Sequence, residues 1–210
     1  MKAGVGITDL TTGLYMHGAI LAALQARHRT GVGQKLDGSL FETQIALLIN
    51  VGMGWLNLGQ EGERWGAQHP SVVPYDAYKT KDLYFVCGAV NDKQFAKLCM
   101  LLDKTELAID ERFKNNDARV NNREELSSIL NEAFATKTTE EWEKAFEGST
   151  LPYGALNTLE KVFKHPQTHA RDMVHEVSFE PSQTGKLKLL GAAILFGCVK
   201  TQLILKQGRR

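Results

Sequence analysis

Asp9 is a carboxylate that stands shortly before a long apolar run, and this position makes it the first candidate for chemistry. The run extends from Leu14 to Leu24. It is too long for a typical strand and is rich in Ala and Leu, so we expect a helix. The helix should end at 27–33, where basic residues are followed by glycines. Asp9 therefore lies at or just before a helix N-terminus, and position alone favours a capping carboxylate that accepts bonds from free N–H groups.

A second candidate is a short segment that contains one glycine and precedes a predicted helix. Glycine allows a backbone to approach a ligand closely. The same composition is typical of an ordinary strand-to-helix turn, and the residues alone do not separate the two interpretations. The segment consists of Gly88, Ala89, Val90 and Asn91.

Other reactive side chains lack the neighbours that their chemistry requires. Cys87 has no histidine pattern beside it that would support a thiol nucleophile. His165 and His169 are four residues apart, but no carboxylate or cysteine completes a metal site. We therefore expect no bound metal. The chain has 3 cysteines and no evident signal peptide, so reduced thiols in an intracellular compartment are expected.

The elements that must position Asp9 are expected to form the first part of the chain. The predicted helix over 13–28 is apolar on nearly every side, so it should be buried all round. Residues 35–40 are predicted to form a short strand and 41–50 a helix. The stretch 51–73 is punctuated by glycines, which is typical of a connector.

From about Val72 the pattern predicts a second, mixed unit. Two strands, 77–80 and 84–87, flank a hairpin turn at Lys81-Asp82, where Leu83 stands in place of a favourable glycine. Asn91 or Asp92 is expected to cap the next helix. The other predicted elements are a helix over 121–135, a helix from 139 to 146 capped by Thr138 or Thr139, a tight turn at 151–155 leading into a helix around 159–162, and strands over 173–180 and 185–190.

These motifs together resemble the family III CoA-transferases, also called the CaiB/BaiF family. The resemblance rests on Asp9-Leu10-Thr11-Thr12-Gly13, the Ala/Leu helix, Arg29-Thr30-Gly31-Val32-Gly33-Gln34 and the segment 35–40. This composite is far more specific than a lone glycine-rich loop. It continues to about Gly191, and within the family it is most similar to the mitochondrial group that acts on succinate with glutarate or hydroxymethylglutarate.

The resemblance implies a covalent mechanism. Asp9 matches the catalytic aspartate of the family, which attacks the donor thioester and carries CoA as an aspartyl thioester. The segment 88–91 matches the family's glycine-rich loop over the thioester, so Gly88 to Asn91 are expected to contact the acyl-CoA. CoA thioesters are then substrates, and no permanently bound cofactor is expected.

The resemblance also implies the architecture, which is an α/β fold with a large open α/β domain and a smaller α+β domain in an interlocked homodimer. This chain would contain only part of the large domain, without the family's N-terminal portion. We expect four segments: 1–50 as the end of the large domain with the catalytic motif, 51–73 as the linker, 74–176 as the small domain, and 177–210 as return strands and a divergent tail.

The composition of the chain limits the classes of binding partner that can be expected. A net charge of +1 gives no reason to expect nucleic acid or an anionic membrane surface. No run of about 18 apolar residues is free of charge, so a membrane span is not expected. The expected partners are acyl-CoA and small dicarboxylic acids. The resemblance implies a mitochondrial location although no presequence is evident, and otherwise a soluble intracellular protein.

Two alternatives remain open. An α-methylacyl-CoA racemase of the same superfamily would need a histidine paired with an aspartate, and that histidine would have to precede Met1. The chain could also be a truncated, inactive fragment that only binds or dimerises. We expect that the 210-residue chain, made alone, has no transferase activity and binds CoA poorly.

Overall fold

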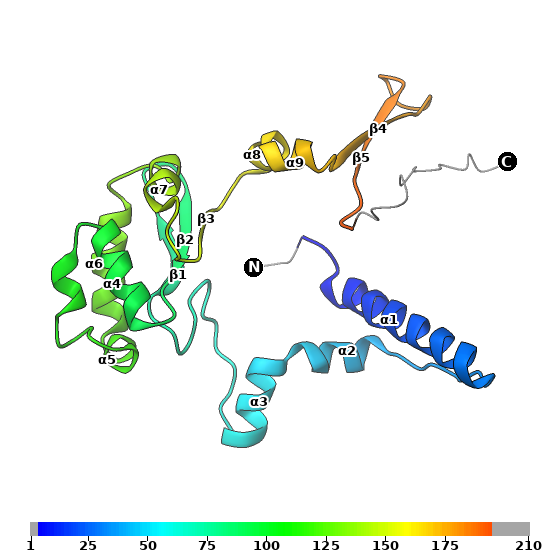
Figure 1. Cartoon of the computed structure of the whole chain (residues 1–210), viewed down its shortest axis with the longest axis horizontal. Helices are drawn as coiled ribbons and strands as arrows, with labels where there is room; N and C mark the ends of the chain where they lie inside the picture. Colours follow the sequence, from blue (N-terminus) through cyan, green and yellow to red (C-terminus); the bar gives the residue numbers. More distant parts are fainter. Residues whose placement is uncertain (1–3, 195–210) are drawn as a thin grey trace. The chain divides into compact units, whose positions relative to one another are not determined.

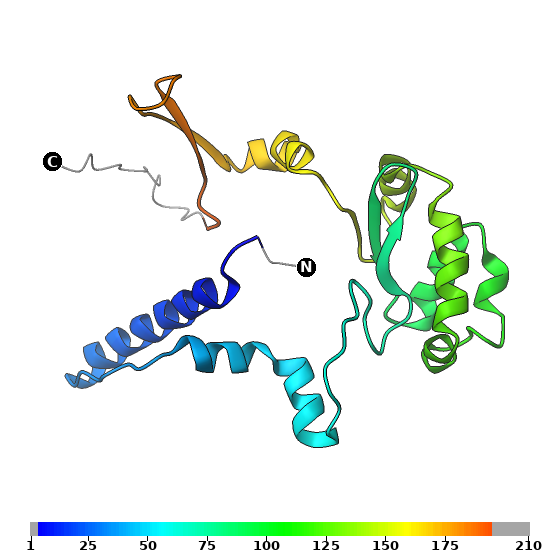
Figure 2. The same cartoon turned by 180° about the vertical axis from the view of Figure 1, so that it is seen from behind.

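The computed structural model describes residues 4–194, and they divide into two compact units between Gly66 and Ala67. Figures 1 and 2 show the elements from opposite sides. None of the helices within residues 4–194 combines the length and the apolar composition that a membrane span requires.

The first unit is helical. It contains α1 (Ile7–Thr30), α2 (Leu40–Leu47) and α3 (Ile49–Leu58), and α2 packs beside α1. The long first helix is confirmed and ends, as predicted, at a left-handed glycine, Gly31 (φ 74°). The strand predicted over 35–40 is wrong: these residues form no strand, and Leu40 already begins α2. α3 also occupies the start of the stretch that its glycines suggested was a connector, since propensity is only a weak guide to helix formation.

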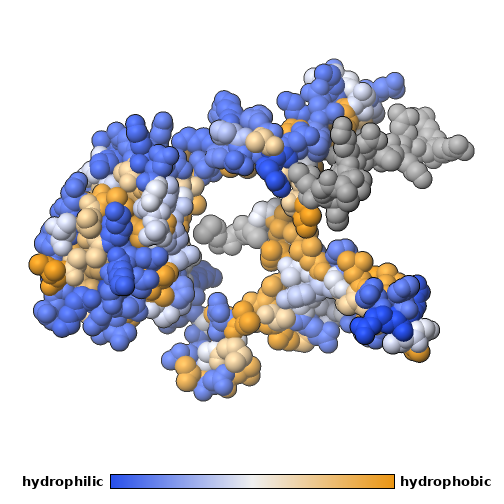
Figure 3. Space-filling view, in the orientation of Figure 1, coloured by the Kyte–Doolittle hydropathy of each residue, from blue (hydrophilic) through white to orange (hydrophobic). Residues whose placement is uncertain are grey.

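The expected burial of α1 on all sides is also wrong for this chain. None of its residues is buried, and the exposed apolar side chains continue onto α2 and α3. Figure 3 shows hydrophobic side chains gathered over these helices. Three helices of this length offer too little surface to cover an element that is apolar all round.

The second unit is built on a small antiparallel sheet of strands β1 (Tyr75–Lys79), β2 (Tyr84–Gly88) and β3 (Tyr153–Ala155), in that order. The predicted hairpin of β1 and β2 is confirmed. The tight turn predicted near 151–155 is wrong in part, because Tyr153–Ala155 pairs with β2 as a third strand. Three residues are too few to show a strand pattern in the sequence.

Helices cover one face of this sheet. They are α4 (Asp92–Leu101), the 3₁₀ helix η1 (Thr105–Ala108), α5 (Asn116–Asn121), α6 (Arg123–Phe134) and α7 (Thr139–Phe146). Phe85 of β2 contacts the rings of Phe134 and Phe146 at centroid distances of 5.8 and 5.1 Å. Every buried hydrophobic residue of the described chain lies between Val73 and Leu151, so this unit holds the core.

The helix caps agree with the sequence. Asn91 accepts a hydrogen bond from the N–H of Gln94 at the start of α4. Thr138 and Glu141 form a capping box at the start of α7. The helix predicted over 121–135 is observed, with a break between α5 and α6 at Asn122.

The last described elements form no core of their own. They are α8 (Leu159–Lys164), α9 (Pro166–Ala170), β4 (Val174–Ser178) and β5 (Lys186–Leu190), and β4 pairs antiparallel with β5. Both strands and α8 are confirmed predictions. None of the residues 159–190 is buried. Cys198 and the tail predicted to diverge lie outside the described residues, whereas Cys87 and Cys99 are buried free thiols.

Candidate active site

Asp9 lies in the first turn of α1, three residues after its N-cap, Gly6. The helix has no side-chain cap, so the capping role that position alone favoured is not observed. The first backbone bond runs from the N–H of Leu10 to the carbonyl of Gly6 at 3.0 Å. The preceding N–H groups of the first turn therefore have no partner within the helix, and they favour a negative charge beside them.

The Asp9 carboxylate lies directly over the backbone of Gly6. A Cβ added at Gly6 would lie only 2.8 Å from Asp9 Oδ2, so a side chain at this position would displace the carboxylate. Asp9 is exposed, and within residues 4–194 it makes no hydrogen bond or ion pair. An unpartnered carboxylate keeps its lone pairs available to attack an electrophile.

Asp9 lines a shallow hollow of about 510 Å³. Its lining is almost entirely apolar, apart from Asp9 itself. An acyl chain could lie against such a surface while its carbonyl carbon faces the carboxylate. The lining residues are Val5, Gly6, Asp9, Leu10, Gly13 and Leu14.

The second candidate segment, 88–91, belongs to the other unit and forms the turn from β2 into α4. Its amides are engaged internally: Gly88 donates to Pro152 O at 3.1 Å, and Ala89 donates to Pro74 O at 2.8 Å. Val90 donates to the side chain of Gln94 at 2.8 Å. The structure therefore gives this segment the contacts of a strand-to-helix turn. Any ligand contact would come from its two exposed residues, Val90 and Asn91.

Position 88 requires a glycine, because a Cβ there would lie 2.5 Å from the ring of Tyr75. These two residues face each other across β1 and β2. They line a second hollow of about 320 Å³ on the uncovered face of the sheet, together with Val86, Cys87, Pro152, Tyr153, Gly154, Ala155 and Leu156. The Cys87 thiol is buried, and burial raises its pKa far above the usual range, which argues against a thiolate nucleophile.

Arg119 is a buried structural residue whose role the sequence did not indicate. Its guanidinium is fully buried and donates to Val73 O, Phe113 O and Asp92 Oδ1 at 2.6, 2.9 and 2.8 Å. It also lies 4.5 Å from the ring centroid of Phe95. One side chain thus joins the start of the second unit to the first residue of α4, directly after the segment 88–91.

Two neighbours of Arg119 on α5 and α6 hold the same stretch of backbone. Asn116 donates to one carbonyl and accepts from one N–H of the segment 69–73, at 2.8 and 3.1 Å. Arg123 donates to two carbonyls of this segment, at 3.0 and 2.6 Å. Their spacing of three and four residues is the only signal in the sequence that could have grouped them.

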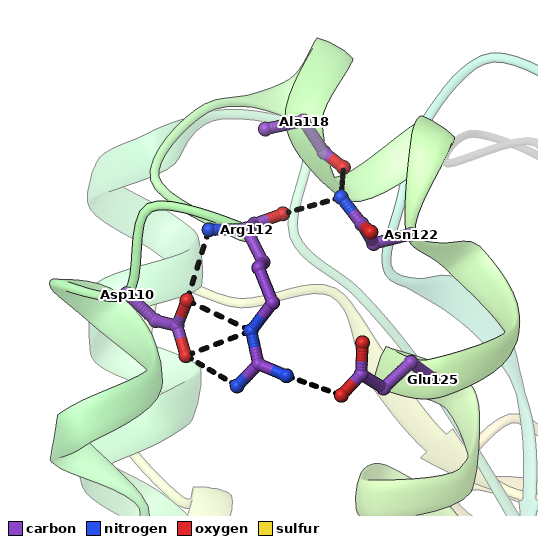
Figure 4. Close-up of polar contacts among 5 residues, drawn as sticks. All are labelled: Asp110, Arg112, Ala118, Asn122 and Glu125. Atoms are coloured by element: carbon purple, nitrogen blue, oxygen red, sulfur yellow. Dashed lines mark hydrogen bonds and ion pairs between the residues drawn. The ribbon is translucent and has the colours of Figure 1, made fainter.

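A further cluster orders the loop before α5, as Figure 4 shows. The Arg112 guanidinium donates to Asp110 at 2.6 Å and also pairs with Glu125 of α6. Its hydrogen bonds hold the pKa of Asp110 below the usual range. Asn122 donates to the carbonyls of Arg112 and Ala118 at 3.2 and 2.9 Å. These contacts fix the backbone next to Phe113, whose carbonyl binds Arg119.

Comparison with known proteins decides the family. The model of the family described as CoA-transferase family III matches residues 1–206. The chain belongs to CoA-transferase family III.

Curated relatives of this chain support the family assignment. An acyl-CoA transferase of Fusarium pseudograminearum is 55% identical over 97% of this chain and 44% of its own length. The human succinyl-CoA:glutarate CoA-transferase is 42% identical over 95% of this chain and 45% of its own length. The chain thus spans about half the length of the curated relatives it matches.

Solved structures support the fold. The crystal structure of a CaiB/BaiF family protein from Brucella suis matches with a TM-score of 0.75 at 36% identity. The match covers 97% of this chain and 52% of that protein. The arrangement of helices and small sheets is therefore that of part of a family III CoA-transferase.

Proposed function

We propose that this chain is the part of a CoA-transferase that carries the nucleophile, Asp9, and that the enzyme moves CoA from succinyl-CoA to a dicarboxylic acid such as glutarate or hydroxymethylglutarate. The observation that carries the proposal is the unpartnered Asp9 carboxylate at the first turn of α1, in a chain of this family. The names of the human and Agrobacterium fabrum relatives, which specify succinate and glutarate, support the choice of substrates.

In the proposed reaction, a carboxylate oxygen of Asp9 attacks the thioester carbonyl of succinyl-CoA. The carbon–sulfur bond breaks, CoA leaves as a thiolate, and a mixed anhydride remains on Asp9. The thiolate then attacks the Asp9 carbonyl, which frees succinate and leaves CoA on Asp9 as a thioester. The acceptor carboxylate repeats these steps in reverse and departs as the new CoA thioester.

The position of Asp9 suits both halves of this cycle. Each attack generates an oxyanion, which the free N–H groups of the first turn would stabilise. Gly6 leaves room for the carboxylate beside these groups. On the resemblance alone, we also propose a homodimer located in mitochondria and a contact between the segment 88–91 and the thioester.

The test is a chimera in which this chain replaces the matching 203 residues of the Fusarium pseudograminearum relative. Transfer from succinyl-CoA to glutarate is measured for the chimera, for its Asp9→Asn variant and for Asp37→Asn. Asp37 is a matched control, because its side chain is 87% exposed and lies outside the hollow. Asp9→Asn should lower the rate on the order of a thousand-fold or more, and Asp37→Asn should leave it unchanged.

Folding of the chimera is checked by circular dichroism and by sedimentation against the parent enzyme. A folded chimera without activity beside an active parent would contradict the proposal. So would an Asp9→Asn variant with full activity.

A further inference from the structure

The first turn of α1 is joined to another element by one side-chain contact. The hydroxyl of Thr8 donates to Oε1 of Gln44, on α2, at 2.5 Å. Within the described part of the chain, no other hydrogen bond links this turn to a different helix or strand. Thr8 directly precedes Asp9, so the contact holds the backbone next to the carboxylate.

Gln44 is itself well placed by the start of α2. Ser39 caps this helix and accepts from the N–H of Glu42 at 3.1 Å, while its hydroxyl donates to the Glu42 carboxylate at 3.0 Å. Thr43, next to Gln44, is only 7% exposed. Gln44 therefore extends from a capped helix whose neighbouring residue is packed.

A second contact joins the segment just before α2 to α1. Gly38 lies so close to Met16 that a Cβ at Gly38 would be 2.5 Å from the Met16 sulfur. Met16 is eight residues after Thr8, or about 12 Å along the helix. The two contacts hold α1 at two separate points, and only the one at Gln44 lies at the candidate nucleophile.

We propose that Gln44 is a positioning residue for Asp9: its amide oxygen holds Thr8 so that the first turn of α1 keeps the Asp9 carboxylate aimed into the hollow. This inference rests on the proposed function. Helix ends fray, and α1 has no side-chain cap to prevent it. A displacement of about 1 Å is enough to lower the rate of attack substantially.

Because this contact is exposed, its effect on the position of Asp9 can be measured apart from any effect on the stability of the fold. Gln44 is exposed, so removing its amide leaves no buried polar group unsatisfied. Loss of Gln44 should therefore affect the chemistry of Asp9 while the fold keeps its stability.

The test compares Thr8→Val, Gln44→Leu and the double variant in the same chimera. Single-turnover experiments measure the rate at which CoA becomes attached to the protein. Each single variant should lower this rate about 2- to 10-fold, because one neutral hydrogen bond is lost. The double variant should be no slower than the slower single variant, since both changes remove the same contact.

Two further readouts and a control variant complete the test. The KM for succinyl-CoA should be unchanged, and the melting temperature should stay within about 2 °C. Gln25→Leu is the matched control, because Gln25 is exposed on α1 and makes no side-chain hydrogen bond within residues 4–194, and it should behave as wild type. Wild-type rates in Gln44→Leu, additive losses in the double variant, or a raised KM would overturn the inference.

Failure of this inference differs from failure of the proposed function. If Asp9→Asn abolishes transfer while Gln44→Leu is fully active, only the positioning role is wrong. If Asp9→Asn is fully active, the nucleophile itself has been assigned wrongly.

Discussion

The carboxylate of Asp82 accepts hydrogen bonds from both the backbone N–H and the hydroxyl of Thr139, at 2.8 and 2.9 Å. Asp82 lies in the hairpin turn between β1 and β2, and Thr139 is the first residue of α7. Asp82 also accepts from the Thr80 hydroxyl at 2.9 Å. The turn is therefore stabilised by a contact distant in sequence, which explains how it tolerates Leu83 where a glycine was expected.

This contact predicts a pH-dependent stability. The backbone hydrogen bond from Thr139 is the main reason that the pKa of Asp82 falls from 3.8 to about 2. A carboxyl group whose pKa is lowered on folding stabilises the fold above its unfolded pKa. The stabilisation from Asp82 should be complete above about pH 5 and should disappear as the pH falls towards 2.

The measurement is thermal unfolding of Asp82→Asn and wild type between pH 2 and pH 7. The variant should melt at a lower temperature at pH 7, and the difference should close near pH 2. Glu132→Gln is the control, because Glu132 is exposed on α6 and has no contact of this kind. A constant difference at all pH values would show that the charge of Asp82 is not involved.

Replacing Arg119 should destabilise the protein more than replacing its ion-pair partner Asp92. Arg119→Met would leave the carbonyls of Val73 and Phe113 without their donor inside the protein, and should lower the free energy of unfolding by about 3 kcal/mol or more. Asp92→Asn should cost about 1 kcal/mol or less, because the Asp92 side chain is 58% exposed. Urea unfolding of both variants measures the difference, and equal losses would contradict this assignment.

The hydrogen bonds to residues 69–73 predict where the chain is cut by proteases. These residues are held by three side chains of α5 and α6, and the core ends at Leu151. Limited proteolysis should cut between Gly59 and Gln68 and again after Leu156. Mass spectrometry should then find a resistant fragment of about residues 69–156. Early cuts inside this range would refute the boundary, whereas a fragment reaching 176 would favour the longer domain expected from the sequence.

The first unit predicts self-association of the chain when it is made alone. Phe41 and Leu56 are 74% and 77% exposed among many other apolar side chains of α1 to α3. Apolar patches of this kind drive association. Sedimentation velocity should show oligomers that increase with concentration, and Phe41→Ser should reduce them. Ile109→Ser is the control, because Ile109 is 84% exposed but lies in the other unit. A monomer at all concentrations would contradict this prediction.

The sequence predicted elements whose signals are local. These signals depend on residues close together in the chain. Examples are the end of α1 at Gly31, the β1–β2 hairpin, and the helix caps at Asn91 and Thr138. The sequence could not predict β3, which is short and becomes a strand only by pairing with Phe85, Val86 and Cys87. It also missed the buried role of Arg119, because that role depends on carbonyls up to 46 residues away.

The candidate site was predicted in part. Asp9 could be selected because its motif is contiguous and specific, and the structure adds that its carboxylate has no partner among residues 4–194. The importance of Gln44 could not be predicted, because it is 36 residues from Thr8 and depends on how α2 packs against α1.

Mapping the covalent intermediate shows directly whether Asp9 is the nucleophile. The chimera is incubated with succinyl-CoA without an acceptor, digested at low pH, and analysed by mass spectrometry. We expect CoA attached through a thioester to Asp9 in the peptide that begins α1, and conversion of this residue to a hydroxamate by hydroxylamine. CoA attached to any other residue, or an unmodified Asp9 in an enzyme that turns over, would show that Asp9 is not the nucleophile.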